Sequence, residues 1–138
     1  SEEDNTMSKT DTILVAAGEA ITQYRFVTVA TDISGNSTVE MADANGEKCL
    51  GVACAAAASG EEVLVATAGY VLVDFAEDAP LGSEITTDTD GKAILADFTG
   101  HNILGFAAPE PVDGTTAQIA NGTRGRVYLY ANKMTLAL

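Results

Sequence analysis

The residues that could carry chemistry are few and scattered. Cys49 and Cys54 lie five positions apart, and on a strand an odd spacing sends two side chains to opposite faces. No second cysteine pair or nearby histidine could complete a zinc site with them. His101 is the one histidine, and no Cys, Ser or carboxylate motif stands beside it that would form a nucleophilic triad. We therefore predict two buried, reduced thiols, no catalytic or metal-binding residue, and a protein that is not an enzyme.

Two other kinds of site could be built around residues 88–92. Asp88-Thr89-Asp90-Gly91 begins like a calcium-binding loop, but Thr99 stands where the closing glutamate should be. Carrier domains for lipoate or biotin present a lysine at a hairpin between two quasi-repeated β units. Here Asp90-Gly91 would occupy the apex of that hairpin, and Lys92 would begin the next strand. An ordinary hairpin turn is the favoured interpretation, with a lipoyl or biotinyl carrier as a remote alternative. Because the GxGxxG and GxxxxGK[ST] patterns are also absent, no cofactor is expected.

The charge of the chain argues against several classes of partner. Its 138 residues include 20 Asp and Glu against 7 Lys and Arg, and the resulting net charge of −13 would repel a phosphate backbone. No segment is long and apolar enough to span a bilayer, and no secretion signal is recognisable. We therefore expect a soluble protein, made in the cytoplasm, that binds neither nucleic acid nor a membrane. The densest positive patch is Arg124-Gly125-Arg126, and arginine forks pair well with carboxylates.

The elements that would position these residues are short strands. A chain of this length has room for one domain with one core. β-branched residues dominate, and turn residues recur about every ten positions, which is typical of an all-β sandwich or barrel. The predicted strands lie at 13–16, 22–30, 38–42, 50–53, 62–66, 69–75, 84–87, 93–96, 103–107, 116–120 and 126–131.

The chain also resembles itself at an offset of 54 residues: Ala42-Asp43, Gly46 and Leu50-Gly51 recur as Ala96-Asp97, Gly100 and Leu104-Gly105. At this offset the alanine-rich run 53–58 corresponds to a stretch with two prolines, so a strand end leading into a loop is expected there rather than a helix. We predict an all-β fold, a compact β-barrel or sandwich built from two quasi-repeated β units at about 38–75 and 92–131. This single domain would span 13–138, and the polar segment 1–12 would form a flexible N-terminal arm.

Several short motifs with glycine turns and small residues follow one another in a distinctive order. They include Gly18-Glu19-Ala20, Leu50-Gly51-Val52-Ala53, Ser59-Gly60-Glu61-Glu62, Gly69-Tyr70-Val71, Pro80-Leu81-Gly82 and Ile103-Leu104-Gly105-Phe106. In this order the chain resembles the small capsid cement, or head decoration, proteins of tailed bacteriophages over about residues 13–131. The resemblance implies a β-barrel protein, commonly trimeric, that sits on the outer surface of an expanded icosahedral capsid, bridges neighbouring capsomers and strengthens the shell. It brings no catalytic or cofactor-binding residue with it.

The predicted function is therefore structural. We expect a homotrimeric virion protein on the outer surface of the capsid, with the major capsid protein as its partner. The candidate contact residues are polar N-terminal residues and two arginines: Ser1, Glu2, Glu3, Asp4, Asn5, Thr6, Lys9, Arg124 and Arg126. The alternative is a carbohydrate- or cell-surface-binding β module, although four Tyr, four Phe and no Trp offer few aromatic platforms for sugar rings.

Overall fold

The fold is built from strands and turns. The computed structural model describes residues 10–109 and 117–134, and no helix occurs among them. In this part of the chain there is accordingly no helix long and apolar enough to cross a membrane. The strands are β1 (Thr10–Ala16), β2 (Phe26–Thr31), β3 (Ser37–Met41), β4 (Gly51–Ala53), β5 (Glu62–Asp74), β6 (Ala79–Pro80), β7 (Glu84–Thr87), β8 (Ala93–Leu95), β9 (Asn102–Ala108), β10 (Gln118–Ile119) and β11 (Arg124–Met134).

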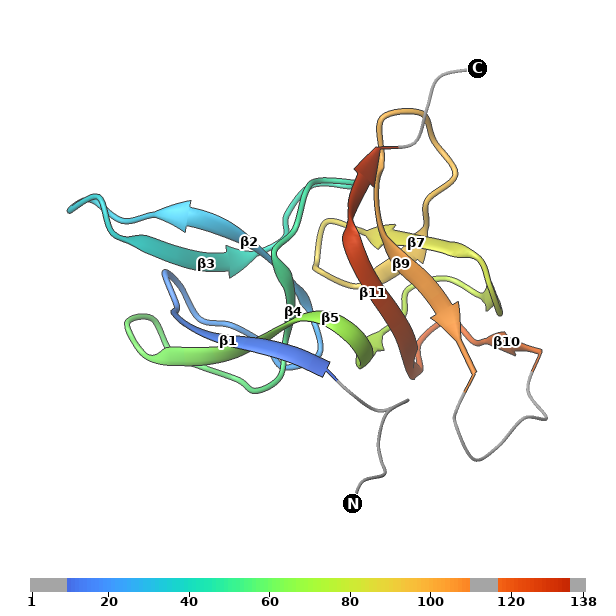
Figure 1. Ribbon diagram of the computed structural model, residues 1–138, viewed down its shortest axis with the longest axis horizontal. Helices are drawn as coiled ribbons and strands as arrows, with labels where there is room; N and C mark the ends of the chain where they lie inside the picture. Colours follow the sequence, from blue (N-terminus) through green and yellow to red (C-terminus); the bar gives the residue numbers. More distant parts are fainter. Residues whose placement is uncertain (1–9, 110–116, 135–138) are drawn as a thin grey trace.

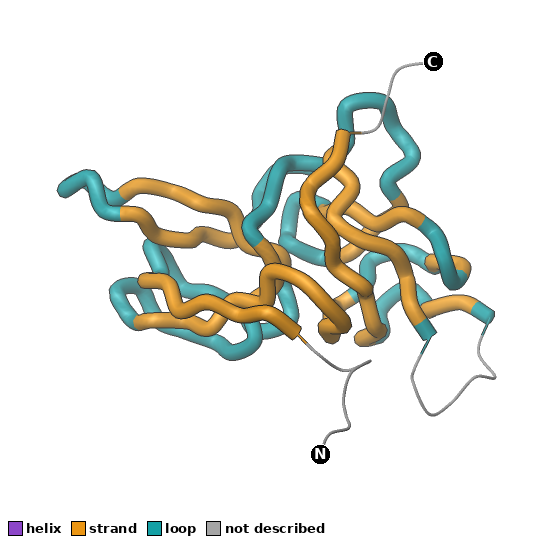
Figure 2. The backbone as a smooth tube through the Cα atoms, in the orientation of Figure 1, coloured by secondary structure: helices purple, strands orange, loops and turns teal. Residues whose placement is uncertain are grey.

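Nine of these strands form one antiparallel sheet, in the order β3-β2-β4-β5-β11-β9-β7-β8, with β1 paired to β5 outside this order. The strands β6 and β10 form a separate pair. The large sheet is strongly curled into a half-barrel, with β1, β2 and β3 at one end and β7, β9 and β11 at the other (Figures 1 and 2). Single bridges from Ala17 to Val39 and from Phe75 to Ala93 bring the segments after β1 and β5 against β3 and β8. The predicted all-β fold is confirmed.

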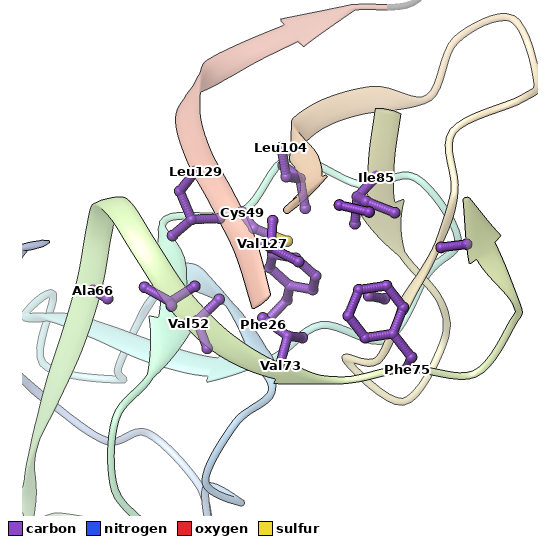
Figure 3. Close-up of a cluster of buried hydrophobic side chains, with 14 of the residues drawn as sticks. Phe26, Cys49, Val52, Ala66, Val73, Phe75, Ile85, Leu104, Val127 and Leu129 are labelled. Carbon is purple, nitrogen blue, oxygen red and sulfur yellow. The ribbon is translucent and has the colours of Figure 1, made fainter. Parts of the chain in front are cut away.

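Two clusters of buried side chains fill the curled sheet, a small core and a large core. Adjacent residues of one strand serve both, because successive side chains point to opposite faces. Phe26 and Val52 lie in the large core, whereas Val27 and Ala53 lie in the small core. The strands β2 and β4 therefore separate the two cores. The large core gathers the biggest side chains, as Figure 3 shows for Phe26, Val73, Phe75, Ile85, Leu104 and Val127.

The 13-residue strand β5 passes from one core to the other. Val63 and Val65 belong to the small core, but Val71 and Val73 belong to the large one, although all four have odd numbers. A β-bulge explains the change: Asp11 pairs with Ala68 and Thr12 with Ala66, so one residue of β5 is left over. An extra residue reverses the face to which every later side chain points. Gly69, with φ +98°, supplies the backbone conformation that the strand needs just after this bulge.

The predicted strand positions agree with the structure except at a few boundaries. The first strand begins at Thr10 rather than at 13, so the last residues of the predicted arm belong to β1. The predicted strands 62–66 and 69–75 are one strand, since Gly69 lies at a bulge and not in a turn. The short strand β6 was not predicted, and the run 53–58 leaves β4 for a loop as expected. The internal repeat remains a proposal, and residues 1–9 lie outside the described part of the chain.

Candidate functional site

The residues singled out for chemistry are held in structural roles. Cys49 is buried in the large core and Cys54 is partly buried against it, and both are free thiols. Burial and the nearby charge of Glu47 raise the pKa of the Cys49 thiol well above its usual range, which makes it a poor nucleophile. His101 packs edge-to-face against Phe98. Over the described residues, no three His, Cys, Asp or Glu side chains converge as metal ligands would.

The segment 88–92 is a hairpin turn between β7 and β8, as the sequence suggested. The Asp88 carboxylate accepts hydrogen bonds at 2.8 Å from the backbone N–H groups of Asp90 and Lys92. These bonds use the carboxylate to close the turn. Lys92 directly precedes β8 and does not occupy the apex, which is the arrangement expected of an ordinary hairpin.

A cluster of arginines around Asp74 is the most developed polar site. The Asp74 carboxylate accepts hydrogen bonds from the Nε atoms of Arg124, at 2.8 Å, and Arg25, at 3.1 Å. The guanidinium of Arg124 also lies over the ring of Tyr24, 3.9 Å from its centroid, in a cation–π contact. Arg25 reaches on to the Asp90 carbonyl at 3.2 Å. The cluster thus joins the end of β5 to the start of β11, to the segment before β2 and to the β7–β8 turn.

The backbone of Tyr24, which belongs to this cluster, has a strained conformation. Its φ is +68°, a conformation that costs a residue with a Cβ about 1 kcal/mol or more. Two hydrogen bonds fix it: the Tyr24 N–H donates to the Ala53 carbonyl at 2.9 Å, and the Asp74 N–H donates to the Tyr24 carbonyl at 3.0 Å. Tyr24 is therefore locked between β4 and β5 with its ring under Arg124.

Asp74 is the anion on which the cluster depends. Partial burial acts to raise its pKa, but hydrogen bonds and charges from Arg124 and Arg25 outweigh this effect and hold the pKa below its ordinary value. Its side chain is 20% exposed, so the ion pairs are only partly screened by water.

Asp74→Asn is expected to lower the free energy of unfolding by about 1–2 kcal/mol at neutral pH, because both arginines lose a charged acceptor. A depressed folded-state pKa gives stability that is full above the unfolded-state pKa of about 4 and is lost as the pH falls through the lower folded-state value. Denaturant titrations of both proteins should therefore show a difference in the free energy of unfolding at pH 7 that disappears well below pH 4. Asp97→Asn, at an exposed aspartate, is the matched control. A difference in the free energy of unfolding that persists unchanged in acid would contradict the stabilising role of these ion pairs.

Two surface hollows adjoin the cluster, and Arg124 lines both of them. One, of about 370 Å³, is lined by Arg25, Asp74, Lys92 and Arg124 among others. The other, of about 270 Å³, lies beside Arg124 and Arg126. Four of the chain's 7 Lys and Arg residues therefore border these hollows. In a chain of net charge −13 this is a local concentration of positive charge.

The structure places Arg124 and Arg126, two of the predicted contact residues, on one face of β11. Sequence reasoning missed Asp74, Tyr24 and Arg25, which cluster with Arg124 from segments about 50 and 100 positions earlier. No local pattern marks these residues, since the pairing of β5 with β11 brings Asp74 to Arg124, and backbone hydrogen bonds to Ala53 and Asp74 bring Tyr24 and its neighbour Arg25 to the same place. The other predicted contact residues, Ser1, Glu2, Glu3, Asp4, Asn5, Thr6 and Lys9, lie outside the described residues.

Comparisons with known proteins relate this chain to others by its fold. No protein-family model matches the chain, and no curated protein matches it. Among solved structures, the head fiber gp8.5 N base of bacteriophage phi29 has a similar fold, with a TM-score of 0.65 and 17% sequence identity. The alignment covers 92% of this chain and 99% of that chain. The two proteins therefore share one fold over nearly their whole lengths.

Proposed function

We propose that this chain is a structural protein of a tailed-phage virion that binds the outer surface of the capsid through the major capsid protein. The observation that carries the proposal is the fold shared, over 92% of this chain, with the base of a phage head fiber. The motif order that resembles capsid cement proteins points to the same place on a virion. A head-fiber base and a cement protein both need a surface that binds the outside of a phage head.

The proposed mechanism is selective binding to a lattice. A protein that binds the expanded shell better than its precursor stabilises the expanded shell, as any ligand selective for one state must. By bridging neighbouring major capsid proteins, each bound copy would oppose their separation. If the protein acts as a homotrimer, three contacts act together, so that weak individual contacts become strong jointly.

The test is co-sedimentation with shells assembled from the major capsid protein encoded nearest to its gene. We expect the protein to pellet with expanded shells, to pellet much less with unexpanded ones, and to raise the temperature at which expanded shells break. Bovine serum albumin at the same concentration controls for trapping in the pellet. Failure to bind either form of the shell would overturn the proposed function.

The N-terminal contact residues are tested in the same assay by deletion of residues 1–9. This deletion leaves β1 intact, because β1 begins at Thr10. If the N-terminal segment folds onto the shell on binding, its loss should lower occupancy severalfold. Undiminished binding would contradict a role for this segment and leave the proposed function in place.

A further inference from the structure

The outer face of the β5-β11-β9 sheet differs in composition from an ordinary solvent-facing sheet surface. In the paired segments 70–74 of β5, 124–129 of β11 and 106–108 of β9, the odd-numbered residues face inward, and Val71, Val73, Ala107 and Val127 are buried. An antiparallel sheet with one face in water normally has polar residues on that face. Here the outward residues are mainly apolar, aromatic or arginine. We call them the arginine–aromatic face: Tyr70, Leu72 and Asp74 of β5, Arg124, Arg126 and Tyr128 of β11, and Phe106 of β9.

An aromatic row forms the first half of this face. Tyr128 stands directly opposite Tyr70 on one side and Phe106 on the other. The ring centroids are 5.1 Å apart for Tyr70 and Tyr128, and 5.4 Å apart for Tyr128 and Phe106. Tyr128, in the middle, is 39% exposed. Because the rings already pack on one another, they lose little side-chain entropy when a partner covers them.

Arginines form the other half, in register with the row. Arg126 lies between Leu72 and Ala108, and Arg124 lies opposite Asp74. Figure 1 shows β11, which carries both arginines, running alongside β9. Arg124 is held by Asp74 and Tyr24, yet its side chain remains 48% exposed. Tyrosine, phenylalanine and arginine are among the residue types enriched in protein interfaces.

The charges on this face indicate which class of partner is complementary to it. Arg25, Lys92 and Arg124 line one hollow together with Asp74, and Arg126 lines the other, so positive side chains are concentrated here although the whole chain carries −13. A twofold pairing of this face with itself would set positive charge against positive charge. A nucleic acid would be repelled by the rest of the chain. The complement of the face is a protein segment with carboxylates beside apolar side chains.

We infer that the arginine–aromatic face is the surface that docks on the capsid, and that it takes an acidic segment of the major capsid protein. Carboxylates of that segment would pair with Arg124 and Arg126, and its apolar side chains would cover Tyr70, Tyr128 and Phe106. This inference rests on the proposed function and adds which face makes the contact and with what chemistry.

The test compares matched variants in the co-sedimentation assay. Arg124→Glu and Tyr128→Ser are each expected to weaken binding to expanded shells tenfold or more, and binding of the wild type should weaken as salt is raised. Lys48→Glu makes the same change of charge at an exposed position beyond the face, and Val29→Ser removes a side chain that is 62% exposed on β2. Both controls should bind like the wild type.

A second measurement needs no variant. Hydroxyl-radical footprinting of the wild-type protein should show Tyr128 protected when expanded shells are bound, while Phe98, 66% exposed on the loop before β9, reacts as before. Wild-type binding with an unprotected Tyr128, or with both face variants binding normally, would overturn the inference but not the proposed function. If Tyr128→Ser instead changes the sedimentation of the free protein and leaves shell binding intact, the face joins copies of this chain and the inference is wrong. A wild type that binds no shell would overturn the proposed function and the inference with it.

Discussion

Gly51→Ala is expected to lower the free energy of unfolding by about 3 kcal/mol or more. A Cβ at position 51 would lie 1.9 Å from the backbone carbonyl oxygen of Ala66 on β5. Backbone cannot move aside as a flexible side chain can, so β4 would have to separate from β5. That would open the boundary between the two cores, where Val52 and Ala53 are both buried. Denaturant titration followed by circular dichroism measures the effect.

A substitution in the β2–β3 turn controls for the loss of glycine itself. Gly35 has φ +87° but no heavy atom within 4 Å of an added Cβ, and asparagine tolerates this conformation. Gly35→Asn should therefore change the free energy of unfolding by less than about 1 kcal/mol. Equal stabilities for Gly51→Ala and the wild type would mean that β4 and β5 do not approach as closely as their pairing requires.

Phe26→Ala should cost about 3–5 kcal/mol, the range for removing a large aromatic side chain from a core. Phe26 is fully buried, and the core around it consists largely of Val and Ala, which cannot move to fill the space of a phenyl ring. Its backbone also anchors neighbours, since the Phe26 N–H donates to the Gly91 carbonyl and its own carbonyl accepts from Ala42. Thermal and denaturant unfolding should both show the loss.

Phe98→Ala is the matched control for this prediction, because it is the same substitution at an exposed position. Phe98 is 66% exposed and makes an edge-to-face contact with His101, so we expect its loss to change the free energy of unfolding by about 1 kcal/mol or less. Similar losses for the two variants would show that the large core does not depend on Phe26 more than the surface depends on Phe98.

Most strand positions could be predicted because alternation and turn residues are local signals. The runs Tyr70-Val71-Leu72-Val73 and Val127-Tyr128-Leu129 are short and rich in β-branched and aromatic residues, which is the composition of a strand. The continuity of β5 could not be predicted in this way. Gly69 looks like the boundary between two strands, and only the pairing with β1 shows that it follows a bulge inside one strand.

The equivalence of Gly51 and Gly105 was visible in the sequence, but its reason was not. A Cβ at Gly105 would lie 2.3 Å from the Tyr128 carbonyl oxygen, much as one at Gly51 would meet Ala66. Both glycines thus allow close approach to a neighbouring strand, which supports the proposed internal repeat.

The candidate site could be predicted only in part. Arg124 and Arg126 stood out because they lie only two positions apart in a chain with few cations, and the structure places them on one face of β11. Asp74 and Arg25, which hold Arg124, come from other elements, and the aromatic row depends on cross-strand register. Such contacts depend on the tertiary fold, and a single sequence does not reveal which distant residues the fold brings together.

The passage of β5 through both cores limits how the protein can be divided. A cut anywhere within β5 would separate Phe26 and Val52, which precede it, from Phe75 and Val127, which follow it, although all four side chains belong to the large core. Either fragment would also expose an unpaired strand edge. Genetic dissection of this chain into two expressible halves should therefore fail, and its two ends should melt in one transition.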